Sequence, residues 1–226
     1  RISVTDRCNF RCTYCMPEQQ TFLPRSDLLD YTEIALIAGR FIKHGIRKIR
    51  LTGGEPLARR DVDVLIQQLG RHVHSGMLDE LTLTTNGSRL ALFAPILKKS
   101  GVRRINVSLD SLVPAKFNAV TRGGDLGQVL DGIAAAKRNG LAVRINMVAL
   151  KGVNDDEILP IAEYCTANGF DLALIETMPL GDGVSGRRVR RATAFRWGDR
   201  RSRTCRRTGQ QRDRAGPARP RPCSRR

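Results

Sequence analysis

Short runs rich in β-branched residues alternate with longer amphipathic stretches, and this alternation limits the fold more than any other feature of the sequence. The strand-like runs lie at residues 2–5, 48–52, 81–85, 104–110, 143–148 and 171–176. The helix-like stretches lie near 31–44, 61–72, 90–100, 126–139 and 156–168, and a glycine follows four of them, as helix C-termini prefer. Strands joined by helices at this spacing pair in parallel, so the pattern predicts an α/β protein.

Two architectures fit this pattern, a doubly wound sheet and a barrel-like sheet. In both, ligands bind at the carboxyl ends of the strands. We predict an incomplete, TIM-like β/α barrel of about six βα units over residues 1–181. We therefore expect every functional residue to lie at or just after a strand end. The sequence contains no run of 18 apolar residues, so we expect no membrane span and no membrane partner.

The alternation stops near Gly181, and residues 182–226 have a different composition. Residues 187–226 contain 16 Arg, no Lys and 2 Asp, so most of the net charge of +17 belongs to this tail. No Leu or Ile occurs after Leu180, so the tail cannot form a core, and we predict that it is disordered. We interpret it as the result of a frameshift, or of an equivalent chimeric end, shortly after Gly181. The rival interpretation is an Arg-rich nucleic-acid-binding tail, disfavoured because Phe195 and Trp197 are its only aromatic residues.

Three cysteines lie close together near the start of the chain, in the segment CNFRCTYC at residues 8–15. A structural zinc site needs four ligands, and no other Cys pair here has metal-ligand spacing. Three thiolates on a [4Fe-4S] cluster leave one iron with an open position, as a catalytic site requires. The next strand ends in LTGGEPL at 51–57, whose glycines allow close approach to a ligand and whose Glu55 can accept from an amino group. The two segments together indicate an active site at neighbouring strand ends.

With CNFRCTYC followed by GGEP, the chain resembles the radical S-adenosylmethionine (SAM) enzymes. The resemblance implies that Cys8, Cys12 and Cys15 hold a [4Fe-4S] cluster whose fourth iron chelates SAM. It implies SAM contacts at Tyr14, Gly54, Ser108 and Met178.

A narrower resemblance is to the GTP 3',8-cyclases of molybdenum cofactor biosynthesis. The segments that carry it are RISVTDRCNFRCTYCMPE, IRLTGGEPLARRD, LTTNG, RRINVSLDSL and KGVNDDEI, between residue 1 and about residue 181. This family rearranges GTP towards cyclic pyranopterin monophosphate, as a lyase. The resemblance implies GTP contacts at Arg1, Lys48, Arg50, Thr84 and Arg144, which suit a polyanion.

The chain departs from this second family in three respects. Arg144 stands where the family usually has Lys, and Ala173 stands where it usually has Arg. The second C-x2-C…C cluster of the family has no counterpart, since only Cys205 and Cys223 lie downstream of residue 181. We therefore expect a truncated and impaired cyclase, and we also expect residues to be missing before Arg1. The alternatives are another radical SAM enzyme with a different substrate, or a non-functional fragment.

The expected partners are GTP and an electron donor, and a homodimer is left open. A cluster of cysteines in an otherwise ordinary α/β chain indicates a metal site in a reducing compartment, so we expect a cytoplasmic location.

Overall fold

The computed structural model describes residues 1–17 and 19–177 of the chain. Its strands are β1 (Ile2–Ser3), β2 (Lys48–Thr52), β3 (Glu80–Thr85), β4 (Arg104–Ser108), β5 (Ala142–Ala149) and β6 (Asp171–Glu176). Its α-helices are α1 (Tyr31–Lys43), α2 (Val62–His74), α3 (Leu90–Lys99), α4 (Pro114–Thr121), α5 (Leu126–Arg138) and α6 (Ile158–Asn168). Single 3-10 turns lie at Arg25–Asp27, Pro56–Ala58 and Asp155–Glu157. The predicted tail at 182–226 lies outside the described residues.

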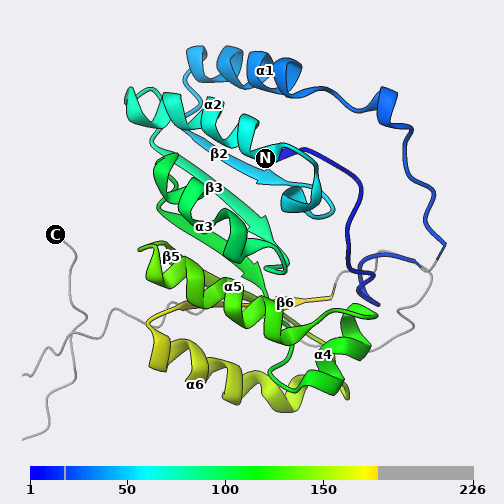
Figure 1. Ribbon diagram of the computed structural model, residues 1–226. Coiled ribbons are helices and arrows are strands. Elements are labelled where there is room, and N and C mark those ends of the chain that lie inside the picture. Colours follow the sequence, from blue (N-terminus) through cyan, green and yellow to red (C-terminus); the bar gives the residue numbers. More distant parts are fainter. Residues whose placement is uncertain (18, 178–226) are drawn as a thin grey trace, which may run out of the picture.

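The six strands form one parallel sheet in the order β1-β2-β3-β4-β5-β6. Each strand pairs with its neighbours in the chain, and right-handed crossovers then place the helices on the same side of the sheet. Figure 1 shows the helices stacked along one side of the strands. A doubly wound sheet requires a reversal in strand order, which is absent from these six strands. The prediction of an α/β fold with six βα units in an incomplete barrel is confirmed, with β1 and β6 as its two edges.

Helix α1 shows how the local sequence sets the element boundaries. Asp30 accepts from the backbone N–H of Glu33, and the Glu33 side chain accepts in return from the backbone of Asp30, which closes a capping box. Ile34, Ala38 and Ile42 then recur every four residues and form the buried stripe of the helix.

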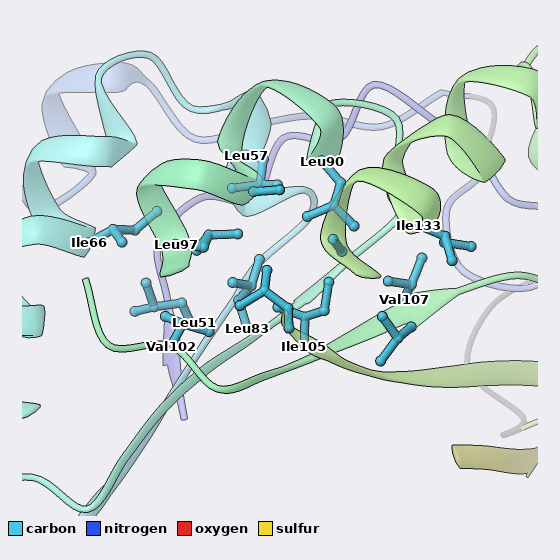
Figure 2. Packing of buried hydrophobic residues seen from close by; sticks show 14 of the residues in the cluster. Leu51, Leu57, Ile66, Leu83, Leu90, Leu97, Val102, Ile105, Val107 and Ile133 are labelled. Atoms are coloured by element: carbon cyan, nitrogen blue, oxygen red, sulfur yellow. The ribbon is translucent and has the colours of Figure 1, made fainter. Parts of the chain in front are cut away.

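The two faces of the sheet have opposite character. Along β5, Val143, Ile145 and Met147 are buried against the helices, whereas Arg144 and Asn146 between them are half-buried on the other face. Figure 2 shows strand residues such as Leu83 and Ile105 packed against residues of α2, α3 and α5. Each such buried side chain contributes about 1.5–3 kcal/mol of transfer free energy. We call the polar face, which points away from the helices, the open face.

Two elements differ from the sequence prediction. Helix α4 was not predicted, because it spans only 8 residues and buries only Phe117, Val120 and Thr121. β1 is shorter than the predicted strand, because after Val4 the chain turns away to bond the β2 end, where Thr5 accepts from Gly54. No helix in the described part of the chain is both long and apolar enough to cross a lipid bilayer.

Candidate functional site

The loop after β1 carries the three cysteines and is anchored on α4. The backbone N–H of Arg11 donates to the Thr121 carbonyl at 3.0 Å, and that of Thr13 donates to the Val120 carbonyl at 2.9 Å. In Figure 1 the dark blue loop leaves the N-terminal strand and runs toward α4. The unpredicted helix therefore has a clear role, which is to hold the cysteine loop near the carboxyl end of β4.

The three thiols are free and close enough to influence one another. Burial raises the pKa of Cys12 to about 12, and the neighbouring charges of Asp110, Cys8 and Cys15 add to the shift. Burial also raises the pKa of Cys8 and of Cys15. The thiols are therefore protonated at neutral pH, and a metal that binds them must displace protons.

The sulfur of Cys8 has two hydrogen-bond donors within the chain. The backbone N–H of Phe10 donates to Cys8 Sγ at 3.4 Å, and Asn86 Nδ2 donates at 3.8 Å. Donors of this kind stabilise negative charge on a thiolate sulfur and adjust the potential of a cluster that it holds.

Tyr14, between the second and third cysteines, ties the loop to β4 and β5. Its hydroxyl donates to Asp110 Oδ2 at 2.6 Å, and Asp110 Oδ1 accepts from the backbone N–H of Val148 at 2.8 Å. Burial raises the pKa of the Asp110 carboxyl to about 6. Asn154, which is fully buried, donates to the backbone carbonyl of Asp110 at 2.7 Å. This connection could not be predicted from the sequence, because its members lie up to 140 residues apart.

A second buried carboxylate holds the loop that follows Asp110. Glu157 is 4% exposed and accepts from the Ser111 hydroxyl and the Leu112 backbone N–H, both at 2.7 Å. The segment KGVNDDEI thus has a structural role: Asn154 and Glu157 fix the end of β4.

The glycines of GGEP allow one part of the chain to touch another. A Cβ on Gly54 would clash with the backbone carbonyl of Arg7, and a Cβ on Gly53 would clash with that of Thr5. The close approach lets Gly54 donate to the Thr5 carbonyl at 2.7 Å and Glu55 donate to the Arg7 carbonyl at 2.8 Å. The closeness joins the β2 end to the cysteine loop, and the SAM contact at Gly54 stays a prediction.

Glu55, the predicted acceptor for a bound amino group, is engaged by the chain itself. It is 1% exposed, and Oε1 accepts from the Leu57 N–H at 2.9 Å and from the Thr85 hydroxyl at 2.8 Å. Oε2 accepts from the Asn86 N–H at 2.6 Å. Glu55 therefore joins the end of β2 to the end of β3, because both of its oxygens are engaged by the chain itself.

The open face carries a layer of charged side chains near the amino ends of the strands. We call it the basic layer; its cations are Arg1, Lys48, Arg50, Arg104 and Arg144, and its carboxylates are Glu80 and Asp171. Glu80 binds Arg104 at 2.8 Å and Asp171 binds Arg144 at 3.3 Å, while Arg144 Nε is buried without a partner. Burial lowers the pKa of Arg50, and the positive charges of Arg1, Arg104 and Arg144 lower it further. Five cations against two carboxylates leave an excess of positive charge that suits a polyanion.

The structure divides the predicted site residues between the two ends of the strands. The cysteine loop, Gly54, Thr84 and Ser108 lie at or just after carboxyl ends, as expected. The expectation is wrong for Lys48, which is the first residue of β2, for Arg50, and for Arg144 near the start of β5. Alternation along the strands places these residues on the open face, where long side chains can reach a ligand without standing at a strand end. Arg1 precedes β1, and Met178 lies outside the described residues.

Arg104 is a charged open-face residue that the sequence reasoning missed. The signal was present in its position, since it begins β4 two residues before Asn106 and faces the same way as Asn106 and Ser108.

The architecture and the motifs agree with a comparison against known families. The model of the radical SAM superfamily matches residues 2–165. The chain belongs to the radical SAM superfamily. The cofactors of this superfamily are a [4Fe-4S] cluster and SAM.

Curated relatives place the chain near one branch of the superfamily. A GTP 3',8-cyclase of Brucella canis is 58% identical over 182 residues, which are 80% of this chain and 53% of the relative. A GTP 3',8-cyclase of Rhodopseudomonas palustris is 57% identical over 187 residues, 83% of this chain and 54% of the relative. This radical SAM protein thus spans about half the length of the curated relatives that it matches.

Solved structures share the fold at low identity. SuiB of Streptococcus suis bound to S-adenosylmethionine has a TM-score of 0.67 and 18% identity, over 83% of this chain and 42% of that one. Methylornithine synthase (PylB) has a TM-score of 0.63 and 17% identity, over 83% and 56% of the two chains.

The cysteine loop suits the superfamily's cluster in its donor set. Within residues 1–17 and 19–177, no three His, Cys, Asp or Glu side chains converge enough to hold a single metal ion. A four-iron cluster needs thiolates on different irons rather than convergence on one ion. Three free thiols on one anchored loop, with donors aimed at Cys8 Sγ, meet that need.

Proposed function

We propose that this chain is the cluster- and SAM-binding part of a GTP 3',8-cyclase, which rearranges GTP towards cyclic pyranopterin monophosphate in molybdenum cofactor biosynthesis. The observation that carries the proposal is the basic layer, near the amino ends of the strands. It lies on the same open face as Ser108 and Thr84, which are near the carboxyl ends. The identity to relatives of that name supports it.

The carboxyl end of the sheet would hold the cofactors. Cys8, Cys12 and Cys15 would bind the cluster through their thiolates, and Tyr14, Gly54 and Ser108 would contact SAM. Bound together, the two cofactors supply one-electron reductive cleavage of the SAM sulfonium and hence hydrogen abstraction. The chain's own residues keep the loop in place: Asp110 fixes Tyr14, and the two glycines fix the GGEP segment.

The basic layer would bind the GTP triphosphate. Arg50 is the key residue of this layer. Burial and the charges of Arg1, Arg104 and Arg144 all lower its pKa, because they disfavour its charged form. A polyanion relieves that repulsion and forms charge-assisted hydrogen bonds with the guanidinium groups. Arg1, Lys48 and Arg144 would contribute further contacts, and Thr84 would contact the nucleotide nearer the cofactors.

The decisive test separates the cofactor chemistry from the substrate. We expect the full chain, reconstituted with iron and sulfide without oxygen, to form 5'-deoxyadenosine from SAM in the presence of a reductant. Cys12→Ala should abolish both the cluster absorbance and this product, whereas Cys165→Ala, a buried cysteine outside the loop, should retain both. Loss in both variants, or in neither, would contradict the assignment of the cluster ligands.

A second candidate is a radical SAM reaction on a different substrate. Ala173 lies beside Asn146 on the open face, and Asp171 already engages Arg144, so this edge offers fewer free cations. GTP titration distinguishes the two candidates. Tight GTP binding that is lost on replacing Arg50 supports the cyclase, whereas the absence of GTP binding in a chain that cleaves SAM supports the second candidate.

The remaining expectations concern the surroundings of the protein. A cytoplasmic location would keep the loop thiols reduced and provide an electron donor. A homodimer stays a prediction, and sedimentation of the reconstituted chain would test it.

A further inference from the structure

A cavity of about 430 Å³ lies against the cysteine loop, and its walls are strongly basic. Arg7, Arg25, Arg59 and Arg60 line it together with Cys8, and none of the lining residues that the structure describes is acidic. The cavity lies between the loop after β1, the start of α1 and the turn that follows GGEP. It shares no lining residue with the basic layer of the open face, so the triphosphate site does not account for it.

Two of these arginines, Arg59 and Arg7, are held by neutral groups. Arg59 donates to the carbonyls of Val4 and Leu29, each at 2.6 Å, and its guanidinium lies 4.4 Å from the centre of the Tyr31 ring. Arg7 donates to the Leu23 carbonyl at 3.2 Å. Carbonyls and rings fix the direction of a guanidinium without cancelling its charge, so both cations continue to attract anions.

The other two arginines, Arg25 and Arg60, extend this charge along the surface. Arg25 is exposed, and Arg60 forms an ion pair with Asp61 at 3.3 Å in which the side chains are 94% and 67% exposed. A pair that is so exposed is weak, so an incoming partner can replace it readily. The result is a basic surface that leads from solvent to the wall formed by Cys8.

We propose that this surface binds the acidic face of a small electron-carrier protein, which delivers electrons to the cluster one at a time. The proposal rests on the proposed function, because it takes Cys8, Cys12 and Cys15 as cluster ligands. In each transfer the carrier loses one electron and the cluster gains one. A charged surface that adjoins a cluster ligand both steers an acidic carrier and shortens the path of the electron.

A protein carrier suits this surface better than a nucleic acid. Guanidinium groups already stand over the rings of Phe22 and Tyr31, at 5.5 Å from Arg7 and 4.4 Å from Arg59. Cations of the chain itself therefore already occupy ring faces on which a base would stack, which disfavours a nucleic acid.

The test compares two double variants of the full, cluster-loaded chain that change the same amount of charge. Arg25→Glu with Arg60→Glu reverses the cavity surface. Arg40→Glu with Arg71→Glu reverses two exposed arginines on α1 and α2. The arginines of residues 187–226 are common to all forms, so differences between variants report the cavity alone. The probe is a bacterial flavodoxin, an acidic flavin protein, in its hydroquinone form.

The first measurement is binding of flavodoxin by calorimetry at low salt. We expect the cavity variant to weaken binding about tenfold or more and the control variant to change it less than about twofold, with the difference shrinking in high salt. Equal weakening in both variants would overturn the proposal. So would inorganic pyrophosphate binding more tightly than flavodoxin, since the cavity would then be a small-anion site.

The second measurement is the rate at which the cluster absorbance is bleached. Reduction by flavodoxin should slow about tenfold in the cavity variant, whereas reduction by the methyl viologen radical, a small cation, should not slow. Equal slowing with both reductants would mean that the arginines support the loop rather than a partner, which would refute the proposal. If no reductant produces 5'-deoxyadenosine from SAM, the proposed function fails, and the binding result still judges the surface.

Discussion

At the carboxyl ends of β1, β2 and β3 the chain holds itself together with backbone hydrogen bonds and one buried carboxylate, whereas at the amino ends the open face carries unbalanced charge. Gly54 and Glu55 bond the cysteine loop at 2.7 and 2.8 Å, and Glu55 accepts three hydrogen bonds from its surroundings. Arg50, by contrast, lies among three other arginines. Burial lowers the pKa of Arg50, and the charges of these arginines lower it further.

The difference separates two requirements of a radical enzyme. A site that positions a cluster has to be rigid before the cluster arrives, so its contacts are complete within the chain. A site that binds a polyanion keeps unsatisfied cations, which cost stability until the ligand binds. Substitutions at the first end should therefore destabilise the protein, and substitutions at the second end should trade binding for stability.

The largest effect is expected where the two backbones touch. Gly54→Ala should lower the free energy of unfolding by about 2–3 kcal/mol, because the added Cβ meets the Arg7 carbonyl. Iron content after reconstitution should fall with it. Gly39→Ala is the matched control, since its Cβ meets nothing within 4 Å and a helix interior favours Ala by about 0.5–1 kcal/mol. Equal stability of the two variants would show that the close contact at Gly54 does not contribute to stability.

The next prediction compares Glu55, which follows the carboxyl end of β2, with Glu80 at the amino end of β3. Glu55→Gln should destabilise the protein by about 1–3 kcal/mol, because the new amide group faces donors and leaves one of them unsatisfied. Glu80→Gln at the amino end should cost less than about 1 kcal/mol, since its ion pair with Arg104 is partly exposed. Urea denaturation of both variants measures the difference, and a larger cost at Glu80 would reverse the comparison.

At the basic layer we expect a change of the opposite sign. Arg50→Met should raise the free energy of unfolding by up to about 1 kcal/mol, because it removes a partly buried charge among like charges. The same variant should weaken GTP binding about tenfold or more, since a charge-assisted contact is lost. Arg71→Met, on the exposed surface of α2, should change neither quantity. A variant that loses stability would show that Arg50 supports the sheet.

The smallest expected effect concerns the exposed ion pair between Arg60 and Asp61. It tests whether surface ion pairs stabilise the carboxyl ends of the strands, where the cysteine loop lies. Asp61→Asn removes the 3.3 Å ion pair with Arg60 but keeps a residue type that tolerates the left-handed φ of 57° at this position. Stability should change by less than about 0.5 kcal/mol. A larger loss of stability, measured by thermal denaturation, would mean that ion pairs also stabilise this part of the protein.

The sequence predicted the parts of the molecule that depend on nearby residues. β-branched runs marked β2, β4 and β6 closely, and the spacing of the cysteines marked the loop that follows β1. It did not show what Glu55 binds, because Thr85 and Asn86 lie 30 and 31 residues further along and only the sheet brings them together. Helix α4 escaped prediction for a related reason, since its 8 residues are stabilised by packing more than by their own pattern.

The placement of the basic layer escaped for a different reason. Rules for α/β proteins direct attention to strand ends, whereas Lys48 and Arg104 begin their strands and act from the side. Alternation along each strand was visible in the sequence, and it correctly places Arg50, Thr84 and Ser108 on one face once the sheet order is known.

The anchoring of the cysteine loop on α4 sets an order of events during synthesis. The loop leaves the ribosome before its supports at Asp110, Val120 and Thr121, which are made about a hundred residues later. At roughly 5–20 residues per second, the nascent chain carries three unsupported thiols for about 5–20 s. Iron delivered in that interval meets a flexible peptide, and iron delivered afterwards meets a formed site. A cluster that needs the anchored loop would therefore be bound only after α4 has formed, and the thiols would need protection from oxidation until then.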